Sequence, residues 1–209
     1  WNAKNFGYKG YQTPEALGEA VKTLYETQYQ GLAMGTLITA RLISPDAKAA
    51  QKLEELVSER VDDYETLFTV HREGPLYEVN KRSGEWVEVD CRITELTEKA
   101  KAIAEASDRA FEPTIGTLVN VWKIGFGGDQ VPARSDIDAA LKKVDYTKIE
   151  TQREDNVCRM RIGKGQSIDL GAIAKGWIGT ALTQDLEAAG ATNVILDLGG
   201  NVALLGKSP

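Results

Sequence analysis

The sequence predicts an α+β fold in which a mixed, mainly antiparallel sheet is flanked by helices. Apolar and polar residues alternate over residues 37–43 and 157–162, which is the pattern of a half-buried strand. Apolar residues recur every three or four positions over residues 53–64, which predicts an amphipathic helix. Hairpin-type returns between the predicted strands favour antiparallel neighbours.

The first 29 residues are expected to form an accessory helical segment ahead of one larger domain over residues 30–209. Thr13 and Pro14 are typical of a helix start, because the hydroxyl can cap the helix and proline suits its first position. Apolar residues follow at helical spacing, namely Leu17, Val21, Leu24 and Tyr25.

The larger domain is predicted to alternate between strands and helices. After strand 37–43, the Ser44-Pro45-Asp46 run ends the strand, and the charged face of helix 53–64 is expected to be plain solvated surface. Residues 67–80 are interpreted as irregular. The later predicted strands are 86–89, 148–150, 157–162, 194–196 and 202–205, and the later predicted helices are 93–107, 135–141 and 173–189.

Composition excludes some classes of function. The chain has 209 residues, 42% hydrophobic and 27% charged, as in an ordinary globular protein. Its formal net charge of −6 leaves no basic face for nucleic acid, so no nucleic-acid partner is expected. No apolar run approaches the ~20 residues that span a bilayer.

Cysteine and histidine offer little sign of chemistry. Cys91 and Cys158 are too few for a disulfide framework and lack metal-ligand spacing, and Cys158 is interpreted as a core residue of a strand. His71 is the only histidine, and we interpret it as a solvated loop residue rather than a member of a catalytic dyad.

The segment from Ile168 to Trp177 carries the strongest local signal. Asp169 closes an apolar run, small residues make a tight turn, and a helix begins directly afterwards, with Lys175 in its first turns. Backbone N–H groups and the lysine suit phosphate oxygens, while the carboxylate suits a hard cation. The same pattern fits a plain strand-to-helix turn capped by Asp169 equally well.

Three further blocks accompany this segment. Ala33-Met34-Gly35-Thr36 precedes a strand, residues 110–119 (AFEPTIGTLV) follow a helix, and Asp197-Leu198-Gly199-Gly200-Asn201 follows a strand. From the residues alone, Met34 is more simply a core residue, and residues 110–119 are equally a helix exit followed by a buried strand. Residues 125–128 lack the strand and helix of a dinucleotide motif, and Gly206-Lys207-Ser208 lacks the first glycine of a P-loop.

Taken in this order, the four blocks resemble the ApbE family, the FAD:protein FMN transferases, from about Gln30 to the last residue. The resemblance implies that the sequence is the N-terminal and central part of an ApbE-like domain. It implies FAD as the substrate and Mg²⁺ as the cofactor. The FAD contacts it implies are Met34, Val70, Ala110, Phe111, Glu112, Asp169 and Lys175. Ala172 would bind magnesium, for which only its backbone carbonyl is suitable.

The sequence departs from the family pattern in two places. Family members often carry an aromatic residue and a polar Asp-Ser pair where this chain has Val70 and His71, so one wall of the flavin pocket is expected to be thinner, with His71 or Tyr77 compensating. The family also continues beyond Pro209 into a segment with acidic and hydroxyl magnesium ligands. We therefore expect this chain alone to be weakly active or inactive, unless a second fragment pairs with a sheet edge after Leu205.

The implied reaction cleaves FAD and attaches FMN through a phosphoester to a Ser or Thr hydroxyl of a partner flavoprotein, releasing AMP. No residue is a compelling general base. The alternatives are an FAD-binding periplasmic protein without transferase activity, or a domain whose site has decayed. The resemblance also implies a place on the periplasmic side of the bacterial cell envelope. Membrane association is expected only through a lipid anchor, of which these residues contain no sign.

Overall fold

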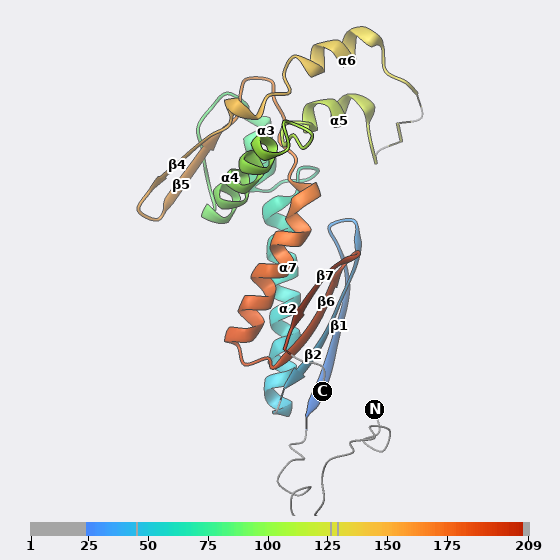
Figure 1. Ribbon diagram of the computed structural model, residues 1–209, viewed down its shortest axis with the longest axis vertical. Helices are drawn as coiled ribbons and strands as arrows, with labels where there is room; N and C mark the ends of the chain where they lie inside the picture. The colour runs from blue at the N-terminus through green and yellow to red at the C-terminus, as the bar shows by residue number, and fades with distance from the viewer. Residues whose placement is uncertain (1–23, 45, 126, 129, 207–209) are drawn as a thin grey trace, which may run out of the picture.

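The computed structural model describes residues 24–44, 46–125, 127–128 and 130–206. Two antiparallel sheets and their helices are stacked along the long axis of the molecule (Figure 1). The lower part has the strand order β1-β2-β6-β7 and contains β1 (Tyr25–Ala33), β2 (Thr36–Ser44), α2 (Ala47–Phe68), α7 (Gly171–Ala188), β6 (Asn193–Leu198) and β7 (Asn201–Leu205). The upper part has the order β3-β5-β4 and contains α3 (Pro75–Lys81), β3 (Val87–Val89), α4 (Cys91–Ala106), α5 (Gly116–Trp122), α6 (Arg134–Leu141), the short 3-10 helix Tyr146–Lys148, β4 (Glu150–Glu154) and β5 (Val157–Arg161).

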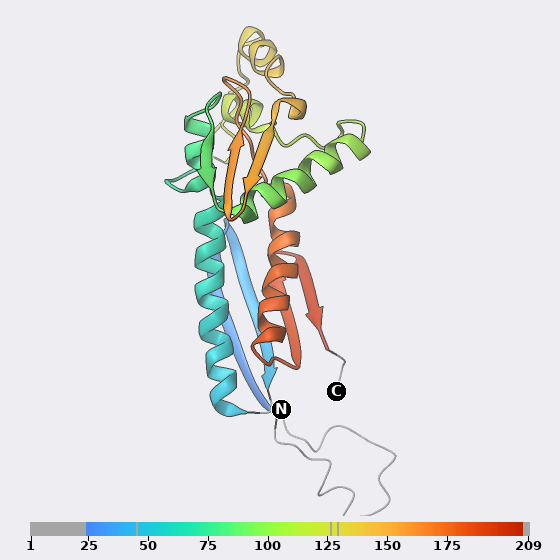
Figure 2. The same cartoon turned by 90° about the vertical axis from the view of Figure 1, so that its left-hand side faces the viewer.

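The long helices α2 and α7 lie on one face of the four-stranded sheet (Figure 2). Alternation in β2 and β6 turns Ile38, Leu42 and Leu196 toward these helices, where all three are fully buried. Asp46 caps α2 by accepting hydrogen bonds from the backbone N–H groups of the next turn. Among the described residues, no helix has the length and apolar character needed to span a bilayer.

The hairpin between β1 and β2 turns at Met34 and Gly35. Both residues have positive φ, 51° and 69°, as a two-residue hairpin turn of the primed type requires. Glycine adopts this conformation freely, whereas Met34 is held in it by the surrounding contacts. Met34 is therefore part of the turn, and the predicted strand begins two residues later, at Thr36.

The α+β prediction is confirmed, with two sheets instead of one. Among the described residues, each neighbouring strand pair is antiparallel, and one parallel bridge joins Ile115 to Ser167 outside the strands. The strand predicted over 148–150 is wrong in its boundaries, because a 3-10 turn precedes β4. Residues 114–119 bend into α5 and do not continue as a buried strand.

Two predictions about helical segments are wrong. Tyr25 belongs to strand β1, because it pairs with Ser44 across the hairpin, and β1 crosses the expected boundary at residue 30. The rest of the expected accessory helix, up to residue 23, lies outside the described residues. Residues 75–81 form helix α3, which starts with Pro75 at its first position, a signal that the irregular interpretation overlooked.

The charged face of α2 is only in part plain solvated surface: Glu55 and Glu59 are exposed, as predicted, but Glu54 and Arg60 make tertiary contacts. Glu54 accepts a hydrogen bond of 2.6 Å from the Thr27 hydroxyl on β1. Arg60 forms an ion pair of 2.8 Å with Asp185 on α7. These side chains therefore tie α2 to the sheet and to the neighbouring helix.

Cys91 and Cys158 form a disulfide that joins the start of α4 to β5. Cys158 is a buried strand residue, as predicted, but neither cysteine is free. The two residues are 67 positions apart, and their Cα atoms come to 5.1 Å because α4 packs across the three-stranded sheet. Sequence spacing carries no information about that packing, so the cysteine count alone missed the bond.

Candidate functional site

A cleft of about 580 Å³ opens where the β1–β2 turn, the end of α2 and the start of α7 meet. Its apolar walls come from the β1–β2 turn, from the end of α2 and the loop after it, from the segment after α5, and from the start of α7. The apolar side chains that form them are Met34, Phe68, Val70, Ile124 and Ala174. A flat, largely apolar ligand with a few polar groups suits such walls.

Four candidate residues from separate blocks of the sequence reach this cleft. Met34, Val70, Asp169 and Lys175 all line it, although up to 141 positions separate them. The hairpin turn supplies the first, the loop after α2 the second, and the start of α7 the last two. His71 also lines the cleft, whereas Tyr77, the other residue considered for the thin wall, is absent from its lining.

Glu65 organises the mouth of the cleft. Its Oε1 accepts a hydrogen bond of 3.3 Å from the backbone N–H of Met34. Its Oε2 lies 3.1 Å from Nη2 of Arg72. One carboxylate therefore links the hairpin turn to the loop that follows α2, and both neighbours face the cleft.

The backbone around Asp169 is held from two sides. Asn80 on α3 forms two hydrogen bonds with the backbone of Ile168, at 2.7 and 2.9 Å. On the other side, the N–H of Asp169 donates to the carbonyl of Pro113 at 2.8 Å. The Asp169 carboxylate then accepts the N–H of Gly171 at 2.8 Å, which closes the turn into α7. Asp169 thus caps the turn and also faces the cleft.

The block at residues 110–112 lies outside the lining of this cleft. Ala110 is exposed and Phe111 packs against the core. The Glu112 carboxylate is 7% exposed and accepts hydrogen bonds from the backbone N–H groups of Thr114 and Tyr146, while Arg109 forms an ion pair with it. Through these contacts Glu112 holds its own loop against the segment that starts at Tyr146.

The Thr114 hydroxyl is also engaged within the protein. It donates to Glu112 Oε1 at 2.8 Å and accepts the N–H of Asp145 at 2.8 Å. Because Thr114 is fully buried and both contacts are internal, this hydroxyl serves the structure of the loop.

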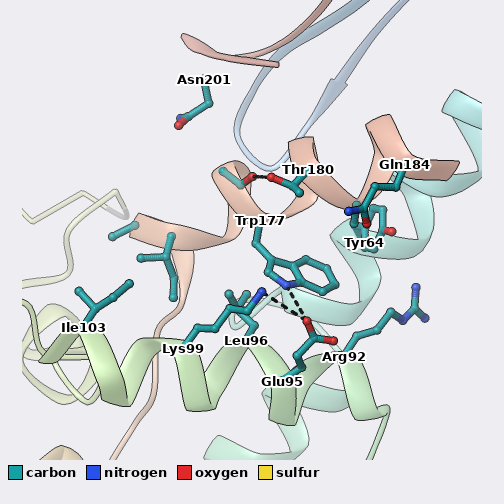
Figure 3. A pocket seen from close by; sticks show the side chains of 14 residues that line it. Tyr64, Arg92, Glu95, Leu96, Lys99, Ile103, Trp177, Thr180, Gln184 and Asn201 are labelled. Atoms are coloured by element: carbon teal, nitrogen blue, oxygen red, sulfur yellow. Dashed lines mark hydrogen bonds and ion pairs between the residues drawn. The ribbon is translucent and has the colours of Figure 1, made fainter. Parts of the chain in front are cut away.

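A second cleft, of about 680 Å³, lies between α4 and α7 (Figure 3). Its floor carries Trp177, whose Nε1–H donates to Glu95 at 3.4 Å. The indole also meets the rings of Tyr64 and Phe68 edge-on, at centroid distances of 5.8 and 5.5 Å. Since Phe68 lines the first cleft and Tyr64 the second, this aromatic cluster separates the two.

Ala172 lines the second cleft, whereas Lys175, about one helical turn later on α7, lines the first. Within the described ranges, no group of three or more His, Cys, Asp and Glu side chains is arranged to hold a metal ion.

Arg92, which lines the second cleft, is ion-paired with Asp90 and Asp63. Hydrogen bonding to the Arg92 guanidinium lowers the pKa of Asp90, the residue that caps α4. Hydrogen bonding to Asp90 and Asp63 raises the pKa of Arg92 in turn. Burial raises the pKa of Tyr64, so its phenol stays neutral at physiological pH. This cluster is a stable ion-paired network.

Comparison with known proteins decides the family. The sequence profile of the ApbE family matches residues 34–209, most of the chain. This chain belongs to the ApbE family. The resemblance inferred from the four blocks is confirmed, and the match begins at Met34, in the hairpin turn.

Individual ApbE relatives support this assignment. The chain is 34% identical over 182 residues to the FAD:protein FMN transferase of Klebsiella pneumoniae, covering 86% of this chain and 56% of the relative. It is 32% identical over 183 residues to the protein of the same name from Treponema pallidum, covering 84% of this chain and 50% of the relative. The chain therefore spans about half of the length of these curated relatives.

Solved ApbE structures share the fold. The ApbE protein of Thermotoga maritima superposes with a TM-score of 0.76 at 29% identity, covering 89% of this chain and 60% of that one. The flavinyl transferase ApbE of Pseudomonas stutzeri gives a TM-score of 0.78 at 21% identity, covering 88% of this chain and 62% of that one. At 21% identity, the similarity to the Pseudomonas stutzeri protein shows a shared fold and no more.

Several cleft residues were missed by the sequence analysis. Glu65 and Phe68 sit at the end of α2, where the helical pattern indicates only which face is buried. Gly125 belongs to the run 125–128, which was considered only as a dinucleotide motif and rejected, and Ile124 directly precedes that run. Arg72 has a basic side chain in a loop, and no spacing rule distinguishes it from other surface arginines.

Proposed function

We propose that this chain forms the flavin-holding part of an FAD:protein FMN transferase. The observation that carries the proposal is the convergence of Met34, Val70, Asp169 and Lys175 on one cleft. Membership of the ApbE family and the names of its relatives supply the reaction class. The substrate would be FAD, and the acceptor would be a Ser or Thr hydroxyl of a partner flavoprotein.

In the proposed reaction the acceptor oxygen attacks the phosphorus of the FMN half of FAD. A new phosphoester bond forms, the pyrophosphate P–O bond to AMP breaks, and the hydroxyl proton is released. Met34 and Val70 would contact the apolar flavin ring, because both belong to the apolar walls. Lys175 would bind phosphate oxygens, and Asp169 would hold the polar end of the nucleotide.

Magnesium, as the proposed cofactor, would neutralise phosphate charge and so favour attack by the hydroxyl. The residues that would hold it are Asp169 and the backbone carbonyl of Ala172. The donor set fits this role, because one Asp169 oxygen accepts the Gly171 N–H and the other has no hydrogen-bond donor within the described part of the chain. One or two protein oxygens with substrate phosphates and water satisfy magnesium.

The transferase would need more polypeptide than these residues. Two observations support this need: the chain covers only 50–56% of the length of the two curated relatives, and within the described part of the chain β7 has an unpaired edge. Strand β7 is an edge strand, and its Val202 and Leu204 side chains are 60% and 69% exposed. A polypeptide equivalent to the remaining part of a relative could add strands there.

We further propose that the protein acts on the periplasmic side of a bacterial cell envelope, held by a lipid anchor. The Cys91–Cys158 disulfide supports an oxidising compartment, since such bonds persist outside the reducing cytosol.

The test combines the purified chain with FAD, magnesium and a flavoprotein acceptor. FAD binding, AMP release and flavin attached to the acceptor are measured, with and without a polypeptide equivalent to the remaining part of the Klebsiella pneumoniae relative. We expect FAD binding by the chain, and substantial AMP release only with the added polypeptide. The variant Asp169→Ala should bind FAD more weakly, whereas Glu59→Ala, exposed on α2, should not.

Two results would contradict the proposal. If FAD binds but no AMP is released even with the added polypeptide, the protein is an FAD-binding protein without transferase activity. If no FAD binds under any of these conditions, the site has decayed.

A further inference from the structure

Arg72 has an unusual position among the charged residues of the flavin cleft. It follows the end of α2 in a loop, lines the cleft, and has a side chain that is 57% exposed. Its Nη2 lies 3.1 Å from Glu65, whose own side chain is only 27% exposed. Because Glu65 also accepts the Met34 N–H, the ion pair attaches Arg72 to the hairpin turn.

This ion pair leaves most of the guanidinium available. An arginine side chain has five N–H donors in a planar fork. Within the described part of the chain, the one carboxylate at ion-pair distance from Arg72 is Glu65, which Nη2 approaches to 3.1 Å. The remaining donors can therefore meet a ligand without losing the contact that holds the side chain in place.

A second cation that could meet an anionic ligand group lies in the same cleft as Arg72. Lys175 lines the same cleft, and no ion pair between described residues includes it. Both Glu65 oxygens already have partners, and one Asp169 oxygen accepts the Gly171 N–H. Lys175 is therefore a second cation beside the apolar walls that no described carboxylate pairs with.

We propose that Arg72 makes a two-oxygen contact with a flavin phosphate, beside the single-point contact of Lys175, with Glu65 as a positioning residue that holds Arg72. The guanidinium fork matches two phosphate oxygens, and such paired, charge-assisted contacts are stronger than neutral ones. The inference deepens the proposed function, on which it rests, by assigning a second phosphate-recognising side chain. It predicts discrimination between flavins with and without phosphate.

The experiment compares three flavins that share one ring system. Riboflavin has no phosphate, FMN has one, and FAD has two, and quenching of flavin fluorescence reports the binding of each. The variants are Arg72→Gln, which removes the charge, and Arg72→Lys, which keeps the charge without the fork. Arg134→Gln is the control, because Arg134 is 84% exposed on α6 and is likewise paired with a carboxylate, Asp138.

We expect Arg72→Gln to weaken FMN and FAD binding about 10- to 100-fold, the range for a lost charged hydrogen bond. Riboflavin affinity should change by less than about twofold, and Arg72→Lys should fall between Arg72→Gln and the unmodified protein. The advantage of FMN over riboflavin should shrink as salt is raised, and Arg134→Gln should change none of these values.

The outcomes separate this inference from the proposed function. Equal weakening of all three flavins by Arg72→Gln would overturn it and place the guanidinium on the ring edge. Unchanged affinities in Arg72→Gln would overturn it as well, while leaving the flavin cleft intact. If the unmodified chain binds none of the three flavins, the proposed function fails and this inference fails with it.

Discussion

The side-chain amide of Asn80 pairs with both backbone groups of Ile168, 88 positions away. The N–H of Ile168 donates to Asn80 Oδ1 at 2.7 Å, and Asn80 Nδ2 donates to the Ile168 carbonyl at 2.9 Å. Asn80 thus takes the place of a neighbouring strand for the residue before Asp169. Through this pair, helix α3 helps to set where the Asp169 carboxylate enters the cleft.

Replacement of Asn80 by alanine should destabilise the protein by about 2–3 kcal/mol, because two backbone groups at a fully buried residue lose their partners. Urea unfolding gives the difference. Asn120→Ala is the control, since Asn120 is exposed and makes one long contact of 3.4 Å with Ser167. A change below about 0.5 kcal/mol in both variants would mean that water replaces the Asn80 amide.

Replacement of Glu112 by alanine should lower the free energy of unfolding by about 3 kcal/mol. Its buried carboxylate accepts charge-assisted hydrogen bonds from the backbone N–H groups of Thr114 and Tyr146, and these would be lost. The free energy of unfolding in urea is again the measurement. Glu105→Ala, on the exposed face of α4, should change it by less than about 0.5 kcal/mol. Equal effects in the two variants would refute the organising role of Glu112.

Reduction of the Cys91–Cys158 disulfide should lower the free energy of unfolding by about 2–4 kcal/mol, since the bond closes a long loop in the unfolded chain. Urea unfolding with and without dithiothreitol measures the loss. The double variant Cys91→Ala, Cys158→Ala should be insensitive to dithiothreitol. Unchanged stability of the original protein after verified reduction would contradict this prediction.

Replacement of Asp90 by asparagine should lower stability near neutral pH by about 0.5–1 kcal/mol, because the cap is retained while a partly exposed ion pair is lost. The folded-state pKa of Asp90 lies below its ordinary value, chiefly through its hydrogen bond with Arg92. The stability from its charge is therefore present above the unfolded pKa of about 3.9 and disappears as pH falls through the lower folded pKa.

The pH dependence of this variant gives the measurement. Thermal unfolding of Asp90→Asn and the original protein should differ at pH 7 and converge toward pH 2. Glu59→Gln, on exposed α2 surface, should follow the original protein throughout. A difference that persists unchanged at the lowest pH would exclude the Asp90 charge as its cause.

Replacement of Val70 by tyrosine should tighten flavin binding about 2- to 10-fold, because an aromatic ring would complete the thin wall of the cleft. Riboflavin should gain as much as FAD, since the contact is with the ring system. Fluorescence titration provides the affinities. The control Val131→Tyr, at a 79% exposed position outside the cleft lining, should leave them unchanged.

The sequence by itself determined several of the local elements and the family. Alternation in residues 37–43 and 157–162 and the helical period in 53–64 identified elements that the structure contains, because these patterns depend on which face of each element is buried. The four blocks were sufficient to recognise the ApbE family, and four of the candidate site residues meet in one cleft.

Tertiary structure alone decided the pairings between distant residues. Cys91 bonds to Cys158, Asn80 holds Ile168, and Glu65 reaches Met34, across separations from 31 to 88 positions. It also placed Ala172 and Lys175 in the linings of different clefts and directed the Glu112 carboxylate to hydrogen bonds within its own loop. Periodicity reports which side of an element is buried, but the partner that covers that side depends on how the chain closes its long loops.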